Sequence, residues 1–493
     1  MPTISQYWEV KDFAAGMDLR KSPITAPAGT LRVLNNAHVT PGGEIEKRGA
    51  FVHRGDADPT SFGLVSIDGL LYTLTTGGTY TAAGPIDTST GMLQIGNIAL
   101  PSSVGLSDVI DWDLYSGRLY VTTSTVAGGV SQHFQDAGGP SAPMVWLDNT
   151  TTNPALATTF RTYKTKIHSI WANTLRFSAA GHPEWWGADD PAATPDPLVG
   201  AGYIILDQED SEMHSLTGLE VYYDKLAVFS NKACQLWAIS HDSTQNQLLQ
   251  TLRQCGTNAP QSIRQYGSGD ILFLGSDGIR SLKAREQLVS AAVSDIGSPI
   301  DSLIRELYAS MGPAWMSQAV AALQPYTGRY WMVFPDRIFV LSNFPSPKIT
   351  AWSVYTLPFT VTDVCEAGEG AIFLRASNNN IYQYGAMNPQ TFDPATEVEI
   401  VTPFLGMERP ATFKQFKAID VACTGNWDVY AALNPGDLDA EDYLGTVTGP
   451  TFLEGQFAMM GHSTHISLRF RNADDQPATI ASCMIHYDRA ETT

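Results

Sequence analysis

The chain has 493 residues, of which 43% are apolar and 16% are charged, and its formal net charge is −20. Because this length exceeds what one hydrophobic core usually organises, we expect two domains, or one large repeat domain with an appendage. The apolar share argues against a disordered chain. The acidic balance argues against a surface that grips nucleic acid, since binding to its backbone needs clustered Lys and Arg.

The N-terminal residues MPTISQYWEVKDF contain no apolar run behind basic residues, so we expect no secretion signal. No window of the chain approaches a transmembrane span. The five cysteines are scattered, without CxxC or another metal-binding spacing. They are expected to be buried, reduced thiols.

Residues 13–51 form a compact Gly-rich phrase. Residues 31–39 and 44–47 are predicted to be a strand pair around the turn Thr40-Pro41-Gly42-Gly43.

A repeated pattern follows between about residues 51 and 385. Its clearest copy is SIRQYGSGDILFLGSDGIRSL, which predicts strands at 262–266, 271–274 and 279–282 separated by Gly and Asp turns. The middle strand is apolar on both faces, so it must be covered on both sides by further copies.

The copies share a turn followed by an apolar strand. They are Asp68-Gly69 before LLYTL, Ser116-Gly117 before RLYVT, Asn173-Thr174 before LRFS, Asp224-Lys225 before LAVFS, Gly269-Asp270 before ILFLG, Gly328-Arg329 before YWMVF, and Glu369-Gly370 before AIFLR. Five copies continue into a third strand: TYTA after Gly77-Gly78, CQLWAI after Asn231-Lys232, IRSL after Ser276 to Gly278, RIFVL after Pro335-Asp336, and IYQYG after Asn378 to Asn380. Their spacing of roughly 40 to 60 residues is typical of propeller blades, which predicts an all-β chain with a six- or seven-bladed β-propeller.

Two sets of phrases carry a family resemblance. The opening has a Gly-rich loop, a strand ending at Asn35-Asn36, and a Gly43-x-Ile45-x-Lys47-Arg48 hairpin; NTLRFSAAGHPEWW, YYDKLAVFS and ILFLGSDGI follow later. In this order they resemble the tail nozzle and head-completion proteins of short-tailed double-stranded DNA bacteriophages. The resemblance extends over about three quarters of the chain, although no single motif is diagnostic and the blades between 119 and 175 are poorly marked.

The resemblance implies a structural virion protein without enzymatic activity or cofactor. Such a protein would be assembled in the host bacterial cytoplasm as a homo-hexamer of the distal tail tube. It would bind a tail adaptor ring, and tail fibres or tailspikes are further possible partners. Double-stranded DNA would pass through its channel without specific binding, and the closed channel would retain the packaged genome.

Two stretches and one helix interrupt the strands. The Ser- and Thr-rich run 122–159 and the stretch 189–200 are predicted loops and candidate gates of the channel. Residues 295–310 predict a helix capped by Ser298 with Pro299 in its first turn. Its apolar face covers a blade edge or contacts a second subunit.

After a Pro- and Asn-rich linker, residues 386–493 alternate as strands do and predict a small β-sandwich. Four cations stand out in it, as solvated positions or as a docking patch for another tail component: Lys414, Lys417, Arg469 and Arg471. The expected division of the chain is therefore an N-terminal strand-hairpin segment (1–50), a propeller (51–385) and the sandwich (386–493).

Candidate chemistry is weak throughout. Ser276-Asp277-Gly278 lacks the spacing and the Trp of a sialidase Asp box, and the acidic pairs Asp189-Asp190 and Glu209-Asp210 are expected to be solvated. The acids at 437–442 resemble the start of a calcium loop but lack its Gly and its final acid. We predict no catalytic, cofactor or metal residues.

Two histidine motifs have structural alternatives. His182-Pro-Glu-Trp-Trp is a hydrophobic plug or a sugar-stacking platform. His462 and His465 would point to opposite faces of a strand, so they cannot share one metal ion. The alternative function is a carbohydrate-binding or glycoside-hydrolysing propeller, which needs facing carboxylates and exposed aromatic rings in one cleft. A peptide-binding propeller scaffold is a third possibility.

Overall fold

Strands dominate the structure, a computed structural model, and helices are few. The described residues are 6–77, 79–87, 90–100, 105–126, 130–135, 144–146, 158–186, 200–267, 269–287, 295–324, 327–367, 370–384, 391–407, 409–437, 440–452 and 456–489. In these ranges, no helix has both the length and the apolar character needed to cross a membrane. The predicted all-β class is confirmed.

Between residues 52 and 384 the described strands form successive groups of three or four; the group that begins at Val320 is part of an 11-stranded sheet. In chain order they are β8 (Phe62–Ile67), β9 (Leu70–Thr76) and β10 (Gly96–Leu100); β11 (Leu106–Tyr115), β12 (Arg118–Thr125), β13 (Val130–Gln135) and β14 (Met144–Trp146); β15 (Thr159–Tyr163), β16 (Lys166–Trp171), β17 (Thr174–Phe177) and β18 (Gly202–Ile205); β19 (Leu216–Tyr222), β20 (Lys225–Ser230), β21 (Ala233–Ala238) and β22 (Gln247–Arg253); β23 (Arg264–Tyr266), β24 (Asp270–Gly275) and β25 (Gly278–Ser281); β26 (Val320–Gln324), β27 (Arg329–Val333), β28 (Arg337–Phe344) and β29 (Ile349–Thr356); and β30 (Val361–Ala367), β31 (Ala371–Ala376) and β32 (Asn380–Tyr384) with β7 (Val52–Asp56).

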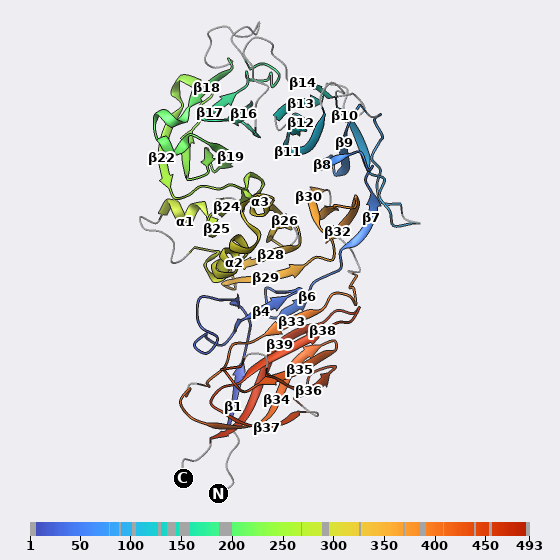
Figure 1. Cartoon of the computed structure of the whole chain (residues 1–493), viewed down its shortest axis with the longest axis vertical. Coiled ribbons are helices and arrows are strands. Elements are labelled where there is room, and N and C mark those ends of the chain that lie inside the picture. The colour runs from blue at the N-terminus through green and yellow to red at the C-terminus, as the bar shows by residue number, and fades with distance from the viewer. Residues whose placement is uncertain are drawn as a thin grey trace.

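These sheets are arranged in a ring (Figure 1). The first strand of each sheet contacts the first strand of the next, in the order β8, β11, β15, β19, β23, β26, β30 and back to β8. The ring is joined where β7 pairs with β32, with Asn380 opposite Asp56 and Gln383 opposite Val52. This is the arrangement of a β-propeller, in which radial sheets leave few free strand edges.

Most of the predicted turns and middle strands are confirmed. Hairpin turns with positive φ occur at Asp68-Gly69 and Ser116-Gly117, directly before β9 and β12. Third strands occur after four of the five predicted second turns, as β21, β25, β28 and β32. Gly and Asp turns therefore identified most blades because they allow the backbone conformation that a tight hairpin needs.

Two strand predictions are wrong. Asn173-Thr174 precedes a third strand, β17, because the first hairpin of that sheet turns at Lys164 and Thr165, both with positive φ. TYTA is not a third strand; that position is taken by β10, which runs parallel to β9, while Thr81 makes only an isolated bridge to Asn97. Neither Lys nor Thr is a typical residue at positive φ, so the sequence carried no sign of the first turn.

Three α-helices lie among the described residues: α1 (Leu282–Gln287), α2 (Asp301–Met311) and α3 (Pro313–Met316). The 3-10 turns are η2 (Leu206–Gln208), η3 (Ser211–Met213), η4 (Ser243–Gln245), η5 (Pro260–Ser262) and η6 (Ser298–Ile300). The predicted helix is confirmed as α2, whose Ile304 and Leu307 are buried. The predicted helix cap at Ser298 is wrong, because Ser298 lies in η6, which precedes α2. The N-cap residue of α2, Ile300, makes no side-chain hydrogen bond to the helix.

Both ends of the chain build the second region, which lies below the ring in Figure 1. Its N-terminal strands are β1 (Gln6–Val10), β2 (Gly16–Met17), β3 (Thr30–Leu31), β4 (Val33–Asn35), β5 (Ala37–Val39) and β6 (Ile45–Lys47). Its C-terminal strands are β33 (Val398–Val401), β34 (Lys414–Thr424), β35 (Trp427–Ala432), β36 (Asp442–Val447), β37 (Phe457–Ser463), β38 (Ser467–Asn472) and β39 (Thr479–Arg489).

These strands form a two-sheet sandwich. One sheet has the order β37-β34-β39-β6-β5, with β1 also paired to β39, and the other contains β4, β33, β38, β35 and β36. The segments 1–50 and 386–493, which the sequence places at opposite ends of the chain, thus share both sheets. The hairpin predicted around residues 40–43 is confirmed as β5 and β6.

The ring and the sandwich are joined at Asn36. Strand β4 pairs with β33 of the sandwich and with β29 of the ring, and Asn36, at φ 56°, redirects the chain from β4 into β5. The Asn36 side chain is buried; its amide donates to the carbonyl of Glu397 at 2.8 Å and its oxygen accepts the Thr356 amide at 2.9 Å. One hydrophobic core runs through this junction, from Leu272 and Trp352 of the ring to Val398 and Phe470 of the sandwich.

Candidate functional site

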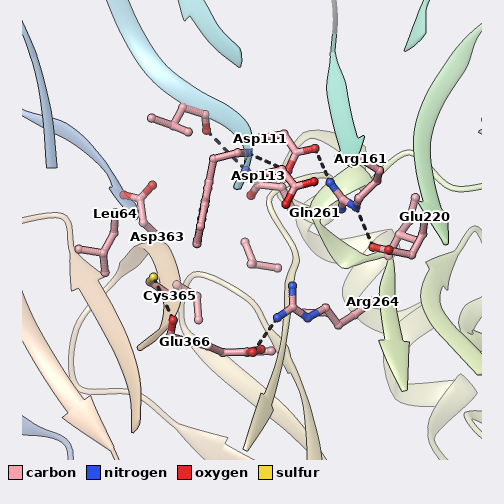
Figure 2. A pocket seen from close by; sticks show the side chains of 17 residues that line it. Leu64, Asp111, Asp113, Arg161, Glu220, Gln261, Arg264, Asp363, Cys365 and Glu366 are labelled. Atoms are coloured by element: carbon pink, nitrogen blue, oxygen red, sulfur yellow. Dashed lines mark hydrogen bonds and ion pairs between the residues drawn. The ribbon is translucent and has the colours of Figure 1, made fainter. Parts of the chain in front are cut away.

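A cavity of about 330 Å³ lies at the axis of the ring (Figure 2). Each first strand of the ring contributes to its wall, because these strands lie innermost. The wall carries five carboxylates and two guanidinium groups: Asp111, Asp113, Glu220, Asp363 and Glu366, with Arg161 and Arg264. Its charge is therefore net acidic.

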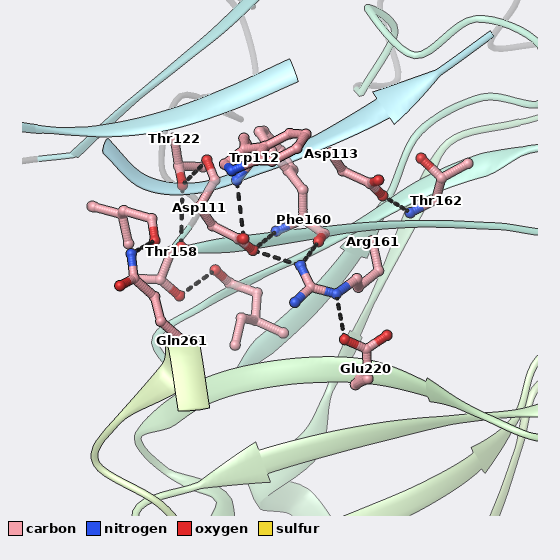
Figure 3. Close-up of polar contacts among 12 residues, drawn as sticks. Asp111, Trp112, Asp113, Thr122, Thr158, Phe160, Arg161, Thr162, Glu220 and Gln261 are labelled. Atoms are coloured by element: carbon pink, nitrogen blue, oxygen red, sulfur yellow. Dashed lines mark hydrogen bonds and ion pairs between the residues drawn. The ribbon is translucent and has the colours of Figure 1, made fainter. Parts of the chain in front are cut away.

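Arg161 joins three neighbouring sheets (Figure 3). From β15 its Nη1 donates to Asp111 Oδ2 of β11 at 2.7 Å, and its Nε donates to Glu220 Oε2 of β19 at 2.9 Å. Burial disfavours the charge of this guanidinium, but the carboxylates of Asp111, Glu220 and Asp113 outweigh burial and raise its pKa. Arg161 therefore stays charged and holds the three inner strands together.

Other carboxylates of the wall also bond to neighbouring sheets. Asp113 of β11 accepts the Thr162 amide of β15 at 2.7 Å. Glu366 of β30 accepts Arg264 Nη2 of β23 at 2.6 Å and the Leu323 amide of β26 at 2.7 Å. These acids act as links between blades, which accounts for their presence in strands that are otherwise half-buried.

Gln261 of η5 crosses the axis. Its Nε2 donates to the carbonyl of Ile110 at 2.7 Å, although β11 and β23 are separated by two other first strands on one side of the ring and three on the other. The Gln261 side chain therefore links opposite sides of the ring across the axial cavity.

Three acids at or beside the cavity, Asp108, Asp111 and Asp363, have pKa values raised above the ordinary range of a carboxyl group. Desolvation by the surrounding strands, and then the nearby Asp363, raise the pKa of Asp108 to about 6, although its side chain is exposed to solvent. Burial likewise raises the pKa of Asp363, whose Oδ2 accepts the Thr362 hydroxyl at 2.8 Å. A carboxyl group with a raised pKa can act as a general acid, which is the role of one member of a hydrolase pair.

The sequence did not indicate the cavity, because its wall takes single residues from strands that are far apart in the chain. A signal was nevertheless present. Charged residues recur in first strands that are otherwise apolar, as in DWDLY, TFRTY and LEVY. Aligning the first strands, rather than the middle ones, would have placed these residues on one axis.

The aromatic motif at 182–186 is structural where it is buried. Trp186 packs on Phe160 and donates to the Pro183 carbonyl at 2.7 Å. His182 stacks on Trp185 with ring centroids 3.7 Å apart. The predicted plug is therefore Trp186, while the stacked pair lies outside the axial cavity.

The remaining acids and histidines also have structural partners. Asp210 caps η3 by accepting the Glu212 amide at 3.0 Å. His462 stacks on Phe413, whereas His465 is buried, and burial lowers its pKa. No group of three or more possible metal ligands occurs in the described ranges. Asp189, Asp190, Asp439 and most of the predicted gating stretches 122–159 and 189–200 lie outside the described residues. The prediction of 122–159 as one loop is wrong where that run is described, because β13 and β14 extend the sheet of β12 there.

The four cations of the sandwich do not form a free patch. Lys414 is buried and donates to the carbonyls of Arg409, Thr412 and Thr464, so its prediction as a solvated residue is wrong. The other three are neutralised by acids: Lys417 by Asp488, Arg469 by Glu441 and Arg471 by Glu399. All five cysteines are free and buried, as predicted.

No family model matches the chain, and no curated protein sequence matches it either. Solved structures resemble it at low identity. The WD40 β-propeller domain of Doa1 is 12% identical, with a TM-score of 0.41, over 70% of this chain and 98% of that chain. A streptogramin B lyase is 10% identical, with a TM-score of 0.43, over 68% and 96%. The virginiamycin B lyase from Staphylococcus aureus is 10% identical, with a TM-score of 0.32, over 59% and 90%. Likenesses this weak carry no argument about function.

Proposed function

We propose that this protein is a structural virion protein, a subunit of the distal tail tube of a short-tailed bacteriophage. In this role six copies surround a channel, one end binds a tail adaptor ring, and fibres or tailspikes attach outside. The tube releases the genome and, when closed, retains it. Assembly in the bacterial cytoplasm and location in the virion tail belong to the same proposal.

The observation that carries the proposal is that the acids at the axis of the ring link its sheets. Asp111, Asp113, Glu220 and Glu366 bond to neighbouring sheets, so the axis of the ring is a site of reinforcement. We count seven blades in this ring, closed by β7. A closed ring whose inner strands are linked is a rigid structure, as the wall of a tube that retains a genome must be.

The opening segment supports the same role. Two residues of the phrase that resembles nozzle proteins, Asn36 and Arg48, are buried where the ring meets the sandwich, and Arg48 Nε donates to Asn36 Oδ1 at 3.0 Å. Arg48 also donates to the Thr356 carbonyl at 3.2 Å. The shared phrase would then preserve the junction between two domains rather than a reactive site.

The net charge of −20 fits a conduit for DNA. Acidic groups along a channel repel phosphates, so a duplex would slide without binding. Because Gln261 crosses the axis of the ring, the DNA path would lie between copies and not through one chain.

Mass measurement and electron microscopy of the purified protein, alone and on tail particles, test this proposal. A ring of six 53.5 kDa chains, of about 321 kDa, with an acidic or neutral bore is the expected result. A bore lined by Lys and Arg would contradict it.

A carbohydrate-active propeller is the second candidate, and the axial cavity favours it. Asp108 and Asp363 have raised pKa values, and Trp112 and Asp363 line the same wall. If a glycan were hydrolysed there, Asp363→Asn would abolish turnover while leaving the fold intact. Screening wild type and this variant against a glycan panel decides between the two functions; hydrolysis lost in the variant would overturn the structural role.

A further inference from the structure

The outer half of one sandwich sheet has two open edges. Here four strands are paired in the order β37-β34-β39-β1, all antiparallel. Along one row Tyr7 of β1 lies opposite His486, His486 opposite Ala418, and Ala418 opposite Ala458 of β37. In the described part of the chain, no strand pairs with the outer edge of β1 or of β37.

The β37 edge lacks the charges that usually discourage pairing, and the β1 edge has only one. Strand β37, FAMMGHS, contains no Asp, Glu, Lys or Arg, and β1 contains only Glu9. Met460 of β37 is 96% exposed, Tyr7 of β1 is 63% exposed, and Phe413 beside β37 is 53% exposed. Exposed edge strands normally carry Lys, Pro or other charges that discourage association.

The charge of the chain limits what can cover these edges. Two copies that each carry −20 repel one another, so they meet most readily where charge is absent. The uncharged β37 edge is such a place.

Strand direction allows a continuous sheet between copies. Because the patch has four alternating strands, β1 and β37 run in opposite directions within one chain. When β37 of one copy is placed beside β1 of the next in the same orientation, these two strands are again antiparallel. Such head-to-tail contacts use two different surfaces and close into a ring when the rotation between copies allows.

We propose that the chain assembles head to tail, the free edge of β37 pairing with the free edge of β1 of a second copy. This inference rests on the proposed ring and identifies the surfaces that build it. Tyr7 and Met460 then lie at the contact, and the sandwiches form a continuous β-layer around the channel.

Two lysine substitutions test the pairing: Met460→Lys on β37 and Tyr7→Lys on β1. Both side chains are exposed, so the fold is retained, which circular dichroism and thermal unfolding verify. Each variant alone is expected to associate at least about tenfold more weakly than wild type in sedimentation velocity. Lysine reduces the net negative charge, so added repulsion between acidic chains cannot account for this loss.

Mixing the Met460→Lys and Tyr7→Lys proteins is the experiment that decides whether β37 pairs with β1. A Met460→Lys chain keeps a free β1 edge and a Tyr7→Lys chain keeps a free β37 edge, so the mixture forms heterodimers that cannot extend. Val126→Lys, at an exposed apolar residue of the ring, is the matched control and assembles as wild type.

Three results would overturn the inference. Rings formed by either variant as readily as by wild type would place the contact elsewhere and leave the proposed function standing. A Tyr7→Lys variant that still dimerises would indicate β37 pairing with itself. Wild-type chains that stay monomeric at every soluble concentration would show that this strand pairing does not hold two copies together by itself. The proposed function is tested separately: a bore lined by Lys and Arg, or hydrolysis of a glycan at the axial cavity, would contradict it.

Discussion

The ring and the sandwich are both mainly antiparallel β-structures, but they pair strands that lie at different distances along the chain. In the ring, each sheet is built from strands that follow one another, apart from β7, and separate sheets are linked by side chains such as Arg161. In the sandwich, strands from both ends of the chain pair with one another in each sheet. Lys47, for example, donates to Asn472, which is 425 residues away. The ring therefore depends on links between local units, whereas the sandwich depends on closing a very long loop.

Removing residues 1–49 is the strongest test of this contrast. It deletes β1 and β6, which pair with β39, and β4, which pairs with β33, together with β2, β3 and β5. The sandwich is therefore expected to lose protection from hydrogen exchange throughout 398–489. The ring sheets β11 to β25 retain protection, because none of their strands comes from this segment. A protected sandwich in the shortened chain would show that the C-terminal strands fold alone. Deleting only residues 1–5 serves as the control.

The links between blades are tested by Arg161→Met. This change leaves Asp111 and Glu220 without their shared cation, and we expect a loss of about 3–5 kcal/mol in the free energy of unfolding. Urea denaturation followed by tryptophan fluorescence measures it. Arg253→Met removes an exposed cation from Asp210, whose carboxylate keeps the Glu212 amide, and is expected to cost about 0–1 kcal/mol. Equal losses in the two variants would mean that the axial links do not stabilise the ring.

The junction between the regions is expected to respond to acid through His38. Its ring is buried, and its Nδ1 lies 2.7 Å from the Tyr355 hydroxyl. Burial, and then Arg329, lower its pKa to about 4, below its ordinary value, so the unfolded chain binds the proton more tightly. The contribution of His38 is complete above about pH 6.5 and falls by about 3 kcal/mol as the pH drops to 4.

His38→Gln removes the titrating group from this site. Stability measured from pH 4 to 7 should therefore depend on pH less steeply in the variant than in wild type. Parallel curves would show that His38 titrates alike in the folded and unfolded chains.

The smallest expected effect concerns a turn of the ring. Thr165 is exposed and β-branched, yet it has φ 62°, a conformation that favours glycine. Thr165→Gly should therefore raise stability by about 1 kcal/mol in thermal unfolding. Thr362→Gly, at an exposed position within β30, should instead lower stability by about 0.5–1 kcal/mol. A destabilised Thr165→Gly protein would indicate that the threonine side chain supports the turn.

Local signals in the sequence were sufficient for much of the ring. Gly, Asp and Asn turns followed by apolar runs located the middle strands β9, β12, β20, β24, β27 and β31, since positive φ and two-sided burial leave a mark on each hairpin separately. The same reasoning missed the Lys164-Thr165 turn and the parallel strand β10, where neighbouring sheets and loop packing override residue preference.

By itself the amino-acid sequence determined the β class, the recurring hairpins, helix α2 and the strong acidity, because each depends on neighbouring residues or on composition. Only the tertiary structure decided that residues 6–47 pair with 398–489, that the inner strands gather Asp111, Arg161 and Glu220 at one axis, and that Gln261 crosses it. These contacts join positions separated by tens to hundreds of residues. Their formation is set by the closure of the ring and by the burial of one shared core, neither of which any single stretch of sequence encodes.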